Sequence, residues 1–179
     1  MATPYPNRAI AALDHGPVLL PGRPGELYDA LHRALTGRGV PCTADPRELR
    51  TAGTGEALVI VTTETPWPCR FGLRRWREHA AHQAWEDRLT QIVVDAAGTV
   101  SGLRLLLLCD TTAGSTQAAI RATRQLGRRM AYECALNGAP ISSTTYAAID
   151  DATPASAAIK SALTWCFTHR AAATDDRPY

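Results

Sequence analysis

The sequence lacks several features that would point to a function. Its 179 residues carry 19 basic and 17 acidic side chains, for a formal net charge of +2, and the two signs are mixed along the chain. No basic tail is present, so a nucleic-acid partner is not implied. The apolar runs are short, and residues 1–16 contain no basic region followed by a long apolar stretch. We therefore expect no membrane span, no secretory signal and a cytoplasmic location.

The cysteines form no recognisable motif, and lysine is almost absent. The five cysteines are widely spaced without a Cys-x-x-Cys pair: Cys42, Cys69, Cys109, Cys134 and Cys166. This spacing is typical neither of a disulfide framework nor of a zinc site, and it favours a reducing compartment. Of the 19 basic residues 18 are arginine, so Lys160 is the only lysine. Any chemistry that requires a lysine amine must therefore use Lys160.

What the sequence does contain is a regular alternation of strands and helices. Apolar runs predict strands at residues 17–20, 57–63 and 103–109. The stretches VPCTA, at 40–44, and APISSTTYAAI, at 139–149, are also expected to be strands. Apolar residues at helical spacing predict helices at residues 27–35, 73–94, 115–136 and 153–168, and residues 45–56 are predicted to be a loop. Because this alternation implies parallel strands and right-handed crossovers, we predict an α/β fold. It is a three-layer Rossmann-like sandwich with a reduced parallel sheet, in a single domain over residues 17–179 that follows an N-terminal extension, 1–16.

In this order the elements resemble the short-chain dehydrogenase/reductase family over nearly the whole chain. The stretch VLLPGRPGELYDALHRALTGRGVPC is similar to that family's first strand, glycine turn, helix and second strand. LRLLLLCDTTAG resembles the strand that leads to its catalytic serine, and RQLGRRMAYECALNGAPIS resembles its long helix and the strand after it. Relative to the family, the chain lacks a helix and a strand between residues 45 and 57 and stops before the last strand. The resemblance therefore implies a sheet that has lost an edge.

The cofactor-binding turn of that family is not retained. Such a turn needs glycines because backbone N–H groups approach the pyrophosphate closely at a helix N-terminus. Only Gly22 stands in register, whereas Glu26 and Tyr28 take the other two glycine positions and Gly25 is one residue out of register. A carboxylate at residue 26 repels a pyrophosphate, and the tyrosine ring would occupy the space of the missing glycine. We expect no cofactor at this chain's turn; a shifted turn through Gly25 is the alternative.

The acid–base pair of the family is missing too. There, a tyrosine and a lysine four residues later share one helix face, and the lysine lowers the phenol pKa. Counting back from YECALNG, these positions fall on Thr116 and Ile120, and the serine position falls on Thr111. Lys160 is preceded at that spacing by Ser156. The resemblance therefore implies a catalytically inactive chain with no catalytic residue.

Two other groups of residues have chemical potential. His79 and His82 lie one helical turn apart beside Glu78, but no third ligand stands at helical spacing, so we expect a solvated helix face and no metal. Cys69 follows a strand and is a candidate nucleophile if a histidine serves as its base, but we favour no role for it.

The two long helices match the pair that forms a four-helix dimer interface in the resembling family. We take as candidate interface residues Trp76, Trp85, Leu89, Leu126 and Met130. The resemblance implies an inactive subunit that pairs with an active reductase paralogue, which alone binds NAD(P). In size and degeneracy the chain is similar to the small companion subunit of two-component β-hydroxyacyl dehydrogenases of aminocoumarin antibiotic biosynthesis. That likeness implies a carrier-bound β-hydroxy or β-keto thioester as the substrate and a carrier protein as a further partner.

Two other functions stay open. The chain is an oxidoreductase with a migrated active site, for which Tyr132 or Tyr146 is the candidate acid, or it is a monomeric module that binds a small ligand at the carboxyl edge of its sheet. Turnover or NADPH binding by the isolated chain would favour the first function, and a stable monomer would favour the second.

Overall fold

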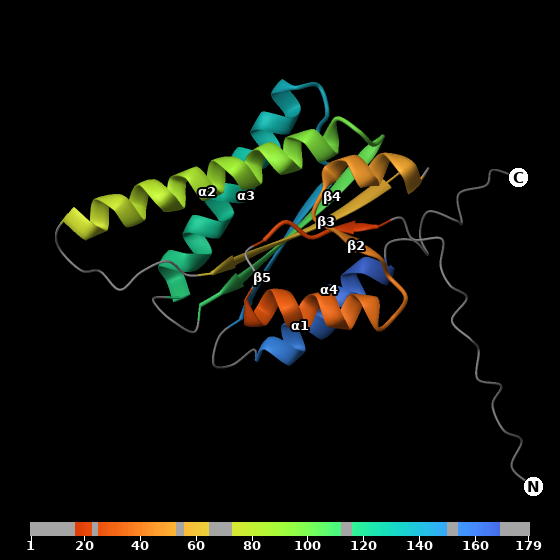
Figure 1. The fold of residues 1–179 in the computed structure, drawn as a ribbon, viewed down its shortest axis with the longest axis horizontal. Coiled ribbons are helices and arrows are strands. Elements are labelled where there is room, and N and C mark those ends of the chain that lie inside the picture. Colours follow the sequence, from red (N-terminus) through yellow and green to blue (C-terminus); the bar gives the residue numbers. More distant parts are fainter. Residues whose placement is uncertain are drawn as a thin grey trace, which may run out of the picture.

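The computed structural model describes residues 17–22, 25–52, 56–64, 73–111, 116–149 and 154–168, so the N-terminal extension lies outside the described residues. Within them, strands and helices alternate (Figure 1). The strands are β1 (Val18–Leu19), β2 (Cys42–Thr43), β3 (Glu56–Glu64), β4 (Gly102–Asp110) and β5 (Ser143–Ile149). The helices are α1 (Glu26–Thr36), the 3-10 helix η1 (Pro46–Ala52), α2 (Leu73–Ala97), α3 (Thr116–Leu136) and α4 (Ala155–Thr168).

The strands form one parallel sheet in the order β2-β1-β3-β4-β5. The two longest strands, β3 and β4, pair along their whole length, from Glu56 opposite Gly102 to Glu64 opposite Asp110. Strand β4 is buried from Leu103 to Cys109, as its unbroken apolar run requires of a central strand covered on both faces. The chain reverses its direction across the sheet between β1 and β3, which is the arrangement of doubly wound folds.

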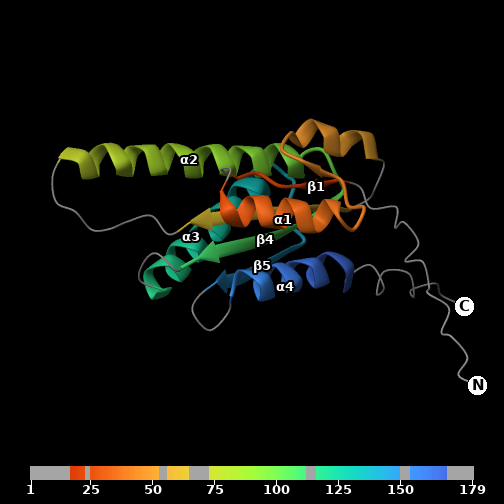
Figure 2. The same ribbon diagram turned by 60° about the horizontal axis from the view of Figure 1, so that its bottom comes forward.

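Helices cover both faces of the sheet. Helices α1 and α4 lie on one face, and α2 and α3 lie on the other (Figures 1 and 2). Alternate strand residues supply the two cores: Ile60 and Leu106 face α1 and α4, whereas Val61 and Leu107 face α2 and α3. This confirms the predicted three-layer Rossmann-like sandwich with a reduced parallel sheet. No helix in the described part of the chain is both long and apolar enough to span a membrane.

Two glycines end helices in the left-handed conformation that favours glycine. Gly39 has φ 75° and follows α1, and Gly138 has φ 73° and follows α3. After each glycine the chain turns back, and the N–H of Val40 bonds the carbonyl of Leu35 at 3.1 Å. These glycines fix where the strands that follow can begin.

The predicted loop at residues 45–56 is wrong, because η1 occupies Pro46–Ala52. The Asp45 carboxylate accepts a hydrogen bond from the N–H of Arg47 at 2.9 Å, which caps this turn. Leu49 is buried in the core beneath α2 and holds the short helix against the sheet. The proline, aspartate and glycines dominated the sequence pattern, and one buried leucine was enough to organise the segment between them.

Candidate functional site

The candidate site is the carboxyl edge of the sheet at the reversal between β1 and β3, since ligands of doubly wound folds bind at this point. Strand β1 leads into Pro21 and Gly22, where the resembling family has its phosphate-binding turn. Strand β3 ends beside it at Thr62, Thr63 and Glu64, and β4 ends at Asp110. The residues around this edge determine what it can bind.

The side chain of Tyr28 packs into the turn after β1. A Cβ atom at Gly22 would lie 2.9 Å from Cδ2 of Tyr28 and 2.8 Å from Oγ1 of Thr62, so neither contact leaves room for one. Tyr28 is half-buried against the core of α1 and α4, and its ring stacks on His32 with 6.3 Å between the centroids. The small size of Gly22 is therefore explained by packing inside this chain. The ring therefore lies against the one glycine that stands in register with the resembling family's turn.

The start of α1 carries negative charge. Its N-cap residue is Gly25, which has no side chain that could cap the helix. The backbone of Gly25 is extended, with φ −177°, a conformation that any residue can adopt. Glu26 and Asp29 are both exposed in the first turn. Carboxylates there stabilise the helix by interacting with its dipole, and they repel an anion that approaches the same N–H groups. These two carboxylates thus disfavour a phosphate at the start of α1.

Thr111, at the position of the family's serine, is used to join two strands. Its hydroxyl donates to the carbonyl of Ile149 at 2.7 Å, and its backbone N–H donates to the same oxygen at 2.9 Å. The residue is 3% exposed, so this hydroxyl belongs to the β4–β5 edge of the sheet. Of the other two degenerate positions, Ile120 is half-buried on α3, and the side chain of Thr116 lies outside the described residues.

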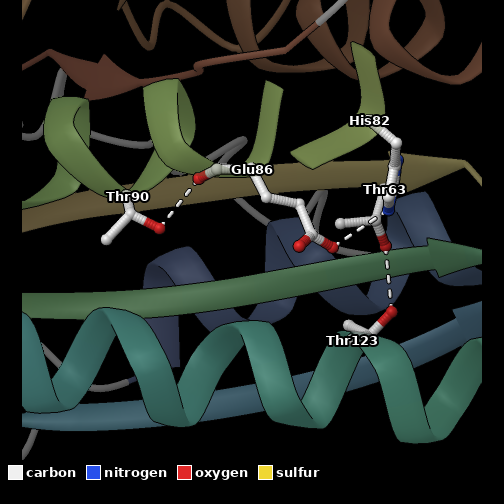
Figure 3. Close-up of polar contacts among 5 residues, drawn as sticks. All are labelled: Thr63, His82, Glu86, Thr90 and Thr123. Atoms are coloured by element: carbon white, nitrogen blue, oxygen red, sulfur yellow. Dashed lines mark hydrogen bonds and ion pairs between the residues drawn. The ribbon is translucent and has the colours of Figure 1, made fainter. Parts of the chain in front are cut away.

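Two threonine hydroxyls join β3 to α3 on the other face of the same edge (Figure 3). The Oγ1 atoms of Thr63 and Thr123 are 3.1 Å apart, and Thr63 also donates to the carbonyl of Leu108 at 3.3 Å. Either hydroxyl can be the donor within the pair, because each has one proton and can also accept. Sequence reasoning missed this pair, since a threonine in an apolar strand looks the same whether or not it meets a partner.

Helix α2 contributes a histidine and a glutamate near that edge. The Nε2 atom of His82 lies 3.0 Å from Oε1 of Glu86, and each side chain is about a quarter exposed, at 27% and 25%. The hydroxyl of Thr90 donates to the Glu86 carbonyl at 2.8 Å (Figure 3). His82 and Glu86 are four residues apart, which is the spacing of an ordinary side-chain pair on one helix face. The contact orients His82, one of the two histidines of α2 that the sequence analysis considered as metal ligands.

The other candidate ligands and nucleophiles do not gather into a site. His79 is exposed, and the side chain of Glu78 and the whole of Cys69 lie outside the described residues. In the part that the structure describes, no three His, Cys, Asp or Glu side chains are placed to hold a metal.

The four cysteines in the described part of the chain are free thiols: Cys109, Cys134 and Cys166 are buried, and Cys42 is half-buried. Burial raises the pKa of Cys42 to about 11 and of Cys166 to about 12. For Cys134, burial and the neighbouring Glu133 carboxylate raise the pKa to about 11. These three thiols are therefore protonated at neutral pH and are poor nucleophiles.

The candidate interface residues lie mostly inside the subunit. Leu89, Leu126 and Met130 are buried in the core between the sheet and helices α2 and α3, and Trp85 is half-buried against that core. The side chain of Trp76 lies outside the described residues. These apolar residues hold the two helices on their own sheet. A partner that meets the helices must contact other side chains, such as those on the exposed face of α3.

The two tyrosines considered as a migrated acid lie away from the crevice. Tyr132 is 63% exposed in the last turns of α3, and Tyr146 is 38% exposed in the middle of β5, over Gly127. Because α3 runs back from the carboxyl edge, Tyr132 lies toward the opposite edge of the sheet.

No family model, no curated protein and no solved structure matches this chain. The resemblance to the short-chain dehydrogenase/reductase family therefore rests on the sequence stretches quoted above.

Proposed function

We propose that this chain is a non-catalytic, reductase-like subunit that pairs in the cytoplasm with an active short-chain dehydrogenase/reductase, which alone holds NAD(P). The observation that carries the proposal is the contact between Tyr28 and Gly22, because the ring covers the glycine that a phosphate-binding turn leaves open to its ligand. The carboxylates of Glu26 and Asp29 support it by repelling phosphate from the start of α1. The buried hydroxyl of Thr111 supports it further, since it is already bonded to β5.

The same proposal assigns a substrate class to the complex. The active partner interconverts a carrier-bound β-hydroxy and β-keto thioester, of aminoacyl or polyketide origin, in secondary metabolism, and the carrier protein is a further partner. This part is supported by the similarity to the companion subunit of two-component β-hydroxyacyl dehydrogenases. The chain's own part is structural: it covers the partner's helices and shapes the entrance to the partner's active site.

Calorimetric titration of the isolated chain with NADPH and with NADH tests the inactive turn. We expect no heat of binding at millimolar cofactor, because Tyr28 and Glu26 oppose the phosphates. The matched variant Glu26→Gly/Tyr28→Gly restores the family's glycines and shows whether the remaining turn retains any affinity. Saturable binding by the wild-type chain at micromolar cofactor would overturn the proposal.

Co-expression tests the pairing. The probe is a full-length short-chain reductase from the same genome with an intact glycine turn and Tyr–Lys pair. We expect the two chains to elute together in size-exclusion chromatography, and the partner's activity on a β-keto thioester to rise when this chain is added. Separate elution with unchanged activity would remove the pairing from the proposal.

A further inference from the structure

One face of α3 carries cationic charge alone. Arg121, Arg124 and Arg128 are exposed there, and α3 has no acidic residue before Glu133. At about 100° per residue, the three arginines lie within about 60° of one another around the helix. Among the residues that the structure describes, these three make no ion pair. We call the set Arg121, Arg124 and Arg128 the arginine stripe.

The neighbouring Arg129 shows how such a charge is neutralised inside the subunit. It is turned toward α2, where its guanidinium lies 2.6 Å from the carboxylate of Asp87. The arginine stripe lies further round α3 and away from that carboxylate. Its charge is therefore available to a carboxylate from another molecule, and arginine suits this role because its planar group binds a carboxylate through two parallel hydrogen bonds.

The arginine stripe continues into apolar surface. Tyr132 and Leu136 follow on the same face of α3, 63% and 64% exposed. With Tyr146 of the adjacent β5, they are the large apolar side chains that are exposed in the described part of the chain. Exposed apolar residues beside arginine and tyrosine are typical of protein interfaces, where arginine and tyrosine often supply most of the binding energy. A nucleic acid would use the arginines but would leave Leu136 in water.

A second copy of this chain is a poor occupant. Symmetric dimers pack the same patch against itself, and Arg124 and Arg128 flank Leu126 at the middle of α3. Two α3 helices packed antiparallel at that midpoint would place Arg124 of one copy opposite Arg128 of the other. Like charges in such contacts oppose binding, so this face selects a different protein.

We propose that the arginine stripe, with Tyr132 and Leu136, docks an acidic helix of the active reductase partner. That helix carries aspartate or glutamate three and four residues apart, opposite the arginines, and an apolar side chain opposite Leu136. The inference rests on the proposed function for the existence of a protein partner. It adds the chemistry that the partner's helix must have, and it explains why the subunit forms a heteromer.

A peptide-binding experiment tests this surface on the full chain. The probe is a fluorescein-labelled helical peptide with glutamates on one face at three- and four-residue spacing and a leucine one turn beyond them. A second peptide has glutamine in place of each glutamate. We expect fluorescence anisotropy to show binding of the glutamate peptide, weaker binding of the glutamine peptide, and a fall in affinity with added salt.

Charge reversal provides the matched control. Arg121→Glu/Arg124→Glu/Arg128→Glu should weaken binding of the glutamate peptide by about tenfold or more, which corresponds to about 1.4 kcal/mol. Arg33→Glu/Arg38→Glu/Arg47→Glu changes the net charge equally at exposed residues outside α3 and should leave the affinity within about twofold. Far-ultraviolet circular dichroism checks that both variants are folded.

Several results would overturn the inference. These are an equal loss in both triple variants, binding of a DNA duplex more tightly than the peptide, or self-association of the wild-type chain that the α3 variant abolishes. None of these results concerns NADPH, so each leaves the proposal that this chain's turn binds no cofactor unchanged. Conversely, NADPH binding by the wild-type chain would leave the peptide result unchanged.

Discussion

The ring of Tyr28 and the missing side chain of Gly22 occupy adjacent space: Cδ2 of the tyrosine lies 2.9 Å from where a Cβ at Gly22 would be. In a nucleotide-binding turn, the smallness of glycine leaves room for phosphate. Here it leaves room for a tyrosine and for the Thr62 hydroxyl, 2.8 Å from the same point. A glycine is thus needed at this place in the fold for a different physical reason.

Gly22→Ala should therefore lower the free energy of unfolding by about 1–3 kcal/mol, because the added methyl group overpacks the turn. Urea denaturation followed by circular dichroism measures this change. In a Tyr28→Ala background the same substitution should cost less, because the contact with the ring is gone. Equal costs in the two backgrounds would show that Tyr28 does not restrict Gly22.

Thr111→Val should lower the free energy of unfolding by about 1 kcal/mol, since it removes one hydrogen bond while the backbone N–H still bonds Ile149. Thr111→Ser keeps the hydroxyl and is the matched control. We expect neither variant to change the activity of the reconstituted complex per folded subunit. Loss of activity with valine and full activity with serine would instead indicate a catalytic hydroxyl.

Gly127→Ala should lower the free energy of unfolding when Tyr146 is present and raise it when residue 146 is alanine. In the wild-type chain the new Cβ would lie 2.6 Å from the hydroxyl oxygen of Tyr146 and 2.9 Å from its Cε1, so the substitution should destabilise the docking of α3 on β5. In a Tyr146→Ala background that space is open, and alanine should stabilise the helix by about 1 kcal/mol over glycine. A double-mutant cycle in urea measures the difference. The same sign in both backgrounds would contradict the contact.

Arg104 is buried, and its guanidinium carbon lies 4.5 Å from the centre of the Trp165 ring. Arg104→Lys keeps the charge but loses the planar group, so we expect a loss of about 1–2 kcal/mol in thermal or urea unfolding. The control is Arg38→Lys, on an exposed turn, which should stay within about 0.5 kcal/mol. If a Trp165→Leu background does not reduce the cost of Arg104→Lys, the ring is not what stabilises this arginine.

The buried thiols predict a loss of stability at alkaline pH. The pKa of Cys166 is about 12 in the folded chain, against 9.0 for an ordinary thiol, so between these values the folded state holds a proton that the unfolded state has lost. Its contribution is complete below pH 9.0 and is lost as the pH rises toward about 12. The slope of unfolding free energy above pH 9.0 should be shallower in Cys166→Ala than in the wild-type chain. Identical slopes would show that this thiol ionises freely in the folded chain.

Much of the fold follows from local sequence patterns. The apolar run at residues 103–109 predicts a strand, and the structure has strand β4 at Gly102–Asp110. The apolar residues at helical spacing from residue 115 predict a helix, and α3 begins at Thr116 and ends at Leu136. The predicted helix at residues 73–94 extends to Ala97, because its last apolar residues still meet the sheet. The error at residues 45–56 arose because a 3-10 helix held by one buried leucine shows no repeated apolar spacing in the sequence.

The sequence alone determined the alternation of strands and helices, the single lysine and the absence of a tyrosine one turn before it, since these depend only on residue order. The tertiary structure decided which way the helices face: Leu126 and Met130 meet the sheet, whereas Arg121 and Arg128 meet solvent. It also decided that Tyr28 lies against Gly22 and that Thr63 meets Thr123. Periodicity shows which residues share a face, but only packing between distant segments shows what that face touches.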